Sequence, residues 1–113
     1  MAIHHPAQTV ISPKDRVSNV VPLYDGGPIQ GEYSVAILEW NGDPCVGIRW
    51  NITERELDDS DKVAGIKTCV GEPNSRGYAT WFILPDDFLR SLLSNGDIPK
   101  KIENYLRQID NKE

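Results

Sequence analysis

The chain has 113 residues, of which 39% are hydrophobic, and it carries a formal net charge of −5 at pH 7. This length suits one domain with a single modest core, and an acidic balance disfavours extensive contact with nucleic-acid phosphates. No stretch approaches the roughly 18 consecutive apolar residues that a membrane helix needs, and the first residues lack a secretory signal. We therefore expect a cytoplasmic protein without membrane contact. We interpret its two cysteines, Cys45 and Cys69, as buried reduced thiols, with a disulfide between them as the alternative.

The N-terminal part of the chain predicts a flexible segment followed by a strand. Residues 1–13 contain two prolines and no periodic pattern, so we expect them to be a flexible N-terminal segment before a single domain spanning residues 14–113. The valine-rich residues 16–24 predict a first strand. The sequence Asp25-Gly26-Gly27-Pro28 ends that strand, because glycine and proline favour turns.

A hairpin is the clearest element of the sequence. Residues 32–40 and 45–50 are rich in β-branched and aromatic side chains, and they flank Asn41-Gly42. Both of these turn residues tolerate the positive φ angles that a type I′ turn requires. Whether the loop has two residues or four, the paired strands divide their side chains between the same two faces.

The two faces of this hairpin differ in bulk. The bulkier and mostly apolar face comprises Tyr33, Val35, Ile37, Glu39, Val46, Ile48 and Trp50. The smaller and more polar face comprises Ser34, Ala36, Leu38, Trp40, Cys45, Gly47 and Arg49. We expect the first face to form the core, since burying large apolar side chains drives folding. The second face would then be open to a partner.

An acidic loop follows the hairpin. Residues 53–62 hold five carboxylates against Arg55 and Lys62, and the carboxylates are Glu54, Glu56, Asp58, Asp59 and Asp61. These carboxylates lack the alternating order of a calcium-binding loop, so we expect no metal site. A concentrated negative charge can instead steer the chain toward a basic partner. The surrounding loop, residues 51–72, is long enough to be functional or mobile, and residues 64–70 predict a short strand within it.

The C-terminal part predicts a last strand and two helices. Residues 77–84 form a nearly continuous apolar strand pattern. Pro85 suits a first helical position, and Asn95-Gly96 suits a helix end. A second amphipathic pattern runs from Asp97 to Ile109. The expected fold is therefore α+β, with an antiparallel, curved sheet of about four strands followed by two C-terminal helices.

The residues needed for catalysis are largely missing from the predicted domain. Both histidines, His4 and His5, fall in the segment expected to be flexible, so a Ser-His-Asp or Cys-His arrangement is not expected. No pair of Cys or His residues inside the domain has zinc-ligand spacing. Asp86 and Asp87 would diverge by about 100° on a helix. We therefore predict a protein that is not an enzyme and has no cofactor.

Aromatic and arginine side chains are the best candidates for a binding surface. Those expected near an exposed face are Trp40, Arg49, Arg76 and Tyr78. Aromatic rings with nearby cations suit single-stranded nucleic acid, where stacking contributes about 1–3 kcal/mol per base. The same residue types are also enriched in protein–protein interfaces.

The runs SVAILEWNGDPCVGIRW and SRGYATWFILPDDFLRSLL resemble the transcriptional coactivator family called positive cofactor four. The matching features are an aromatic strand end, a tight turn, a strand ending near Ile-Arg, a glycine-containing strand, a helix start with proline or an acid, and an aromatic helix residue. They fall at Trp40, Asn41-Gly42, Ile48-Arg49, Gly77, Pro85 and Phe88.

This resemblance implies a curved four-stranded sheet, a homodimer and a sheet face that binds single-stranded nucleic acid. Carried over by position, it places Trp40 and Arg49 on that face and Arg76 beside it. The chain departs from the family because residues 32–40 carry Glu32 and Glu39 but no Lys or Arg. The alternative is an acidic protein-interaction module, an adaptor or inhibitor, that binds a basic protein partner.

Overall fold

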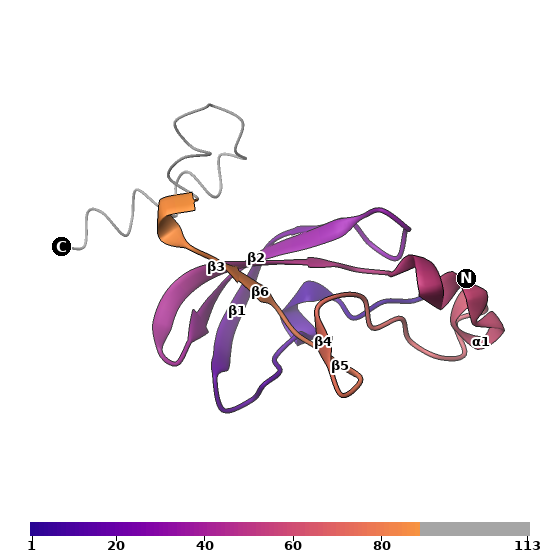
Figure 1. Cartoon of the computed structure of the whole chain (residues 1–113), viewed down its shortest axis with the longest axis horizontal. Coiled ribbons are helices and arrows are strands. Elements are labelled where there is room, and N and C mark those ends of the chain that lie inside the picture. The colour runs from indigo at the N-terminus through magenta and orange to yellow at the C-terminus, as the bar shows by residue number, and fades with distance from the viewer. Residues whose placement is uncertain (89–113) are drawn as a thin grey trace. The chain divides into compact units, whose positions relative to one another are not determined.

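The computed structural model describes residues 1–88 of the chain (Figure 1). Met1–Ile83 form one compact unit, and a second unit begins at Leu84. The described part is mostly β, and none of its helices reaches seven residues. Its strands are β1 (Val17–Asp25), β2 (Tyr33–Trp40), β3 (Asp43–Trp50), β4 (Asn74–Ser75), β5 (Tyr78–Ala79) and β6 (Phe82–Leu84). Its short helices are the 3-10 turns η1 (Ala7–Thr9) and η2 (Glu54–Asp58) and the α-helical turn α1 (Ser60–Val63).

The main sheet has four antiparallel strands in the order β1-β2-β3-β6, and β4 and β5 form a separate two-stranded sheet. The expected strand number is confirmed, but the sheet does not curl, contrary to the curved sheet that the resemblance implies. The last predicted strand, residues 77–84, is divided between β5 and β6, with Trp81 between them. The predicted strand at residues 64–70 is wrong, because these residues form turns and bends with one isolated bridge, from Cys69 to His4.

The predicted hairpin is confirmed in detail. Trp40 pairs with Asp43 across a two-residue loop, and Asn41 and Gly42 have φ angles of 54° and 85°. Positive φ at both positions is the signature of a type I′ turn, whose twist matches that of the strands. The bulges of β1 against β2 and the presence of Pro22 keep this edge strand irregular, as is common at exposed sheet edges.

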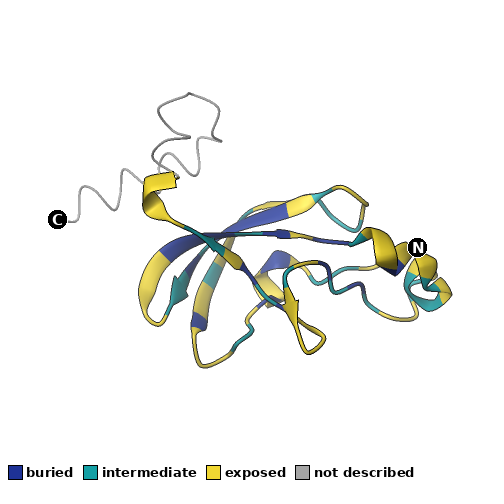
Figure 2. Cartoon of the chain, viewed as in Figure 1, coloured by how far each residue is buried: buried dark blue, intermediate teal, exposed yellow. Residues whose placement is uncertain are grey.

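The core lies on the face of the hairpin that was expected to be open. We call the side bearing Ser34, Ala36, Leu38, Cys45, Gly47 and Arg49 the inner face, and all six residues are buried (Figure 2). The opposite, outer face is exposed at the end where Tyr33 (42% exposed) pairs with Trp50 (53% exposed), although Val35 and Val46 farther along this face are buried. The prediction that the bulkier face forms the core is therefore wrong at that end.

Small side chains explain why the inner face is covered. A Cβ on Gly47 would lie 2.9 Å from a Leu38 methyl and 3.0 Å from the Cβ of Trp81. The indole of Trp81 therefore packs directly on the β3 backbone, where it is 4% exposed. Its Nε1 donates to the carbonyl of Val10 at 2.7 Å, which ties the N-terminal segment to the same core.

Residues 1–13 are packed in the structure, in contrast to the flexible segment expected. Ala7 and Val10 are buried in the core cluster, and His4 forms a bridge with Cys69. The start of the chain lies beside α1, where a Cβ on Gly65 would fall 2.3 Å from the Met1 carbonyl (Figure 1). Short apolar residues without periodicity can thus fill a core when other elements surround them.

The two predicted C-terminal helices fall almost wholly outside the described residues. Asp86–Phe88 are helical, in agreement with the predicted start near Pro85. Residues 89–113, which include the second predicted helix, are not described. Among residues 1–88, no helix is long and apolar enough to cross a membrane.

Candidate nucleic-acid interface

Arg49 does not face a partner, contrary to the sequence-based expectation, because it is 3% exposed on the inner face. Its guanidinium donates to the carbonyls of Pro73, Thr80 and Val70, with a distance of 3.2 Å to Pro73. Burial lowers its pKa to about 10, against the opposing effect of Glu56 and Asp25. The side chain therefore stays charged at neutral pH and holds the segment from Val70 to Thr80 against β3.

Arg76 and Tyr78 lie together on the β4–β5 hairpin. Ser75 pairs with Tyr78 across a two-residue turn formed by Arg76 and Gly77, and these two residues have φ angles of 53° and 82°. The left-handed region costs a side chain like arginine about 1–2 kcal/mol. Tyr78 is 67% exposed, so the hairpin presents a cation and an aromatic ring to solvent.

Two neighbouring grooves border this hairpin. One, of about 570 Å³, is lined by Ser12, Pro13, Trp40, Ser75, Arg76, Tyr78, Thr80 and Trp81. The other, of about 640 Å³, is lined by His5, Thr9, Ile11, Ser12, Lys14, Gly77, Tyr78 and Ala79. They share Ser12 and Tyr78, so they form one surface, which we call the hairpin groove. Three of the four predicted binding residues, Trp40, Arg76 and Tyr78, meet here.

The hairpin groove is polar and cationic within an acidic chain. Its charged lining residues are Lys14 and Arg76, and no carboxylate among the described residues lines it. Burial and the nearby Arg49 lower the pKa of His5, so its imidazole is neutral at pH 7. Asp15 and Arg16, both exposed, continue the turn beside Lys14. The opposite charges of this pair offset each other, which leaves Lys14 and Arg76 to set the local sign.

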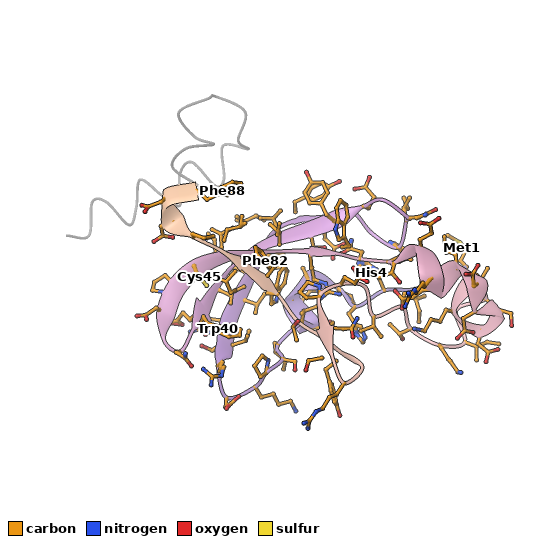
Figure 3. The ribbon with its side chains drawn as sticks, in the orientation of Figure 1. Met1, His4, Trp40, Cys45, Phe82 and Phe88 are labelled. Atoms are coloured by element: carbon orange, nitrogen blue, oxygen red, sulfur yellow. The ribbon has the colours of Figure 1, made fainter. Side chains whose placement is uncertain are left out.

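Trp40 lies at the end of β2 next to the turn (Figure 3). It is half-buried and packs against the core cluster, while part of its surface lines the hairpin groove. It therefore forms a wall of the groove, whereas Tyr78 is its exposed ring. Trp40 therefore borders the hairpin groove, while Arg49 is buried, so the two residues do not share the open sheet face that was predicted for them.

The acidic loop is not one continuous steering surface. Glu56 is 8% exposed and accepts hydrogen bonds from the backbone N–H groups of Thr53, Val70 and Gly71 and from Lys62 Nζ. Asp59 accepts from the N–H of Asp61 at the start of α1. Asp61 itself lies 3.7 Å from Lys67. Glu54 and Asp58 remain exposed, so they alone match the prediction of freely displayed charge.

Sequence reasoning missed the contribution of the N-terminal segment to the site. His5, Thr9 and Ser12 line the hairpin groove, but residues 1–13 were expected to be flexible. His4, labelled in Figure 3, has its Nε2 at 2.8 Å from Asp25 Oδ1, so both histidines belong to the packed unit. The two histidines therefore lie in packed structure and not in a mobile tail, and the absence of enzymatic activity stays a prediction. The apolar pair Val10-Ile11 was the available signal that this segment packs, since Val10 is buried in the core.

Compared with known proteins, the chain matches no family model, no curated protein and no solved structure. The resemblance to the positive cofactor four family therefore stays a prediction that depends on the residues quoted for it. Within residues 1–88, no group of three or more His, Cys, Asp or Glu side chains is arranged to hold a metal ion. The case for a function depends on the geometry of the hairpin groove.

Proposed function

We propose that this chain is a non-enzymatic protein that binds single-stranded nucleic acid in the hairpin groove. The observation that carries the proposal is the gathering of Lys14, Arg76 and the exposed ring of Tyr78 on a surface that no carboxylate of residues 1–88 lines. The chain as a whole has a net charge of −5. The positive charge of the hairpin groove is therefore a property of this site and does not follow from the composition of the chain.

The chemistry of the groove suits a single strand better than a duplex. Bases of a single strand are free to stack on an exposed ring, and each such contact contributes about 1–3 kcal/mol. Lys14 lines one of the two grooves, Arg76 lines the other, and Tyr78 lines both, so the two cations can contact phosphates near a base stacked on the ring. Hydroxyl groups of Ser12 and Ser75 offer further hydrogen bonds to phosphate or sugar.

The backbone at Arg76 supports a functional role for its charge. The chain places asparagine at the first position of its other type I′ turn, Asn41-Gly42, where positive φ is readily tolerated. At the corresponding position of the β4–β5 turn it places Arg76, at a cost in stability. Residues held in unfavourable backbone conformations cluster at functional sites. Arg76→Asn would relieve this cost while removing the cation.

The test is a fluorescence-anisotropy titration of the full chain with labelled oligothymidylate and with a duplex of equal length at low salt. We expect the single strand to bind more tightly than the duplex. Tyr78→Ala should weaken single-strand binding about tenfold, as expected for the loss of one stacked base. Arg76→Asn should weaken it without loss of stability.

A matched control variant is Phe82→Ala, which removes a ring that is 58% exposed outside the hairpin groove. It should leave the affinity unchanged. Absence of binding at low salt, or equal weakening by Phe82→Ala and Tyr78→Ala, would contradict the proposal. The homodimer that the resemblance implies stays a prediction, which light scattering of the full chain measures.

A further inference from the structure

Three exposed aromatic rings meet on the outer face of the sheet, and none of them lines the hairpin groove. The rings of Tyr24 and Tyr33 have centroids 4.8 Å apart, and those of Tyr33 and Trp50 lie 6.4 Å apart at an interplanar angle of 83°. Their residues are exposed by 41%, 42% and 53%. Contiguous exposed apolar surface of this kind marks interaction sites, and tyrosine and tryptophan are the residues that most often anchor interfaces.

Trp50 lines two grooves. One, of about 610 Å³, is lined by Tyr33, Ile48, Arg49, Trp50, Glu72, Pro73 and Asn74. The other, of about 690 Å³, is lined by Gln30, Gly31, Trp50, Ile52, Thr53, Glu54, Arg55 and Glu72. Trp50 and Glu72 belong to both. We call the three rings and these two grooves the aromatic surface, and no residue that lines it lines the hairpin groove.

The aromatic surface is held rigidly by backbone pairing. Trp50 N donates to the Glu72 carbonyl at 2.7 Å, and Glu72 N donates back to the Trp50 carbonyl at 3.0 Å. Tyr33 pairs directly with Trp50 across β2 and β3. Only glycine fits at position 71, where a Cβ would fall 2.1 Å from the Trp50 carbonyl. The ring of Trp50 and the carboxylate of Glu72 are therefore carried side by side on fixed backbone.

Carboxylates surround the rings. Glu32 accepts a hydrogen bond from the Tyr24 hydroxyl at 2.7 Å, while Glu54 and Glu72 are exposed and line the grooves. Two arginines offset part of the negative charge of these three carboxylates. Arg55 is exposed, whereas the guanidinium of Arg49 is buried and donates to backbone carbonyls. The three carboxylates and two arginines sum to a net charge of −1, which is opposite in sign to the charge of the hairpin groove.

We propose that the aromatic surface binds a basic linear peptide segment through its arginine or lysine side chains. A guanidinium or ammonium group over the face of tryptophan or tyrosine is attracted by the ring. Neighbouring carboxylates add attraction of their own, and the apolar stems of the basic side chains cover the rings. The proposal is independent of the proposed function, because it uses a different surface with the opposite charge.

The test uses an end-capped arginine–glycine octapeptide and the same peptide with citrulline in place of arginine, which keeps the shape and removes the charge. Binding is followed by the indole N–H resonances of the isotopically labelled full chain, with the Trp50 signal assigned from a Trp50→Phe variant. The arginine peptide should shift the Trp50 signal more than those of Trp40 and Trp81. The citrulline peptide should bind at least about tenfold more weakly.

Two variants and two controls locate the site. Trp50→Ala and Glu72→Gln should each weaken arginine-peptide binding about fivefold or more, and Glu72→Gln keeps the size and backbone of the residue it replaces. Asp58→Asn removes an exposed carboxylate outside the aromatic surface, and Tyr78→Ala removes the ring of the hairpin groove. Both should change peptide affinity less than about twofold.

Three results would overturn the inference. Equal binding of the citrulline peptide would show that charge is not recognised. Equal weakening by Asp58→Asn and Glu72→Gln would show diffuse attraction to an acidic protein. A Trp50 shift caused by oligothymidylate and not by the arginine peptide would assign the surface to nucleic acid. Loss of single-strand binding in Tyr78→Ala with intact peptide binding would separate this site from the hairpin groove.

Discussion

Glu56→Gln should destabilise the chain more than any other substitution in the acidic segment. The Glu56 carboxylate accepts from Lys62 Nζ at 2.8 Å and from the N–H groups of Val70 and Gly71 at 2.6 and 2.9 Å. It also accepts from the backbone and hydroxyl of Thr53 at 3.0 and 3.1 Å. One buried carboxylate therefore joins the start of η2 to the segment that leads into β4. Glutamine keeps the shape but loses the charge and one acceptor oxygen.

The size of the effect follows from the titration of this group. Burial alone would raise the pKa of Glu56, but the hydrogen bonds from Lys62, Thr53, Val70 and Gly71 lower it from an ordinary value of 4.5 to about 2. At about 1.4 kcal/mol per pKa unit, the ionised form contributes about 3 kcal/mol to folding at neutral pH. Because the folded-state pKa is lowered, this stability is present above about pH 4.5 and is lost as the pH falls toward 2.

Urea unfolding followed by tryptophan fluorescence measures this contribution. At pH 7 Glu56→Gln should lower the free energy of unfolding by about 2–3 kcal/mol, and the gap from the unaltered chain should shrink as the pH approaches 2. Glu54→Gln, an exposed change in the same 3-10 turn, should stay within about 0.5 kcal/mol. A gap that is absent at pH 7, or that persists unchanged at pH 2.5, would refute the reasoning.

Other substitutions test the packing. Arg49→Met should cost about 3 kcal/mol in urea unfolding, because the carbonyls of Val70, Pro73 and Thr80 lose a charged donor. Gly47→Ala should lower stability by about 1–3 kcal/mol in thermal unfolding, since its methyl would press on Leu38 and Trp81. Burial raises the pKa of Asp25, but hydrogen bonds from the Ala7 and Gly27 N–H groups and from His4 lower it overall. The ionised Asp25 therefore stabilises the fold above the pH range in which carboxyl groups ordinarily titrate. Asp25→Asn should therefore speed hydrogen exchange at the Ala7 amide, measured by NMR at neutral pH. Unchanged stability in Arg49→Met or Gly47→Ala, or an unchanged exchange rate in Asp25→Asn, would contradict the role given to the contact that the substitution alters.

Local chemistry made part of the fold predictable. Asn41-Gly42 specifies its turn because both residues accept positive φ, and the two-residue loop then sets the register of β2 and β3. The strand number followed from β-branched runs between breakers. The second turn, Arg76-Gly77, escaped prediction because arginine is rare at such a position and the flanking strands have only two residues each.

Tertiary packing decided what the local pattern did not. The larger side chains of the hairpin suggested the core face, but the small residues Ala36 and Gly47 allow Trp81 and the N-terminal segment to approach the sheet closely. Arg49 is buried because carbonyls from Val70 to Thr80 need a donor there, and these residues are distant in sequence. The same packing of distant segments places Lys14 and Tyr78 in the lining of one groove. No spacing in the sequence indicates that these two residues lie close together.

The salt dependence of single-strand affinity, compared between the unaltered chain and Arg76→Asn, tests the central claim most directly. Each phosphate contact to a single strand contributes a slope of about −0.7 to the logarithm of affinity against the logarithm of salt concentration. If Arg76 contacts a phosphate from the hairpin groove, the variant should bind more weakly and its slope should be smaller in magnitude by about 0.7. Identical affinities and slopes, or no affinity of the unaltered chain at low salt, would contradict the account.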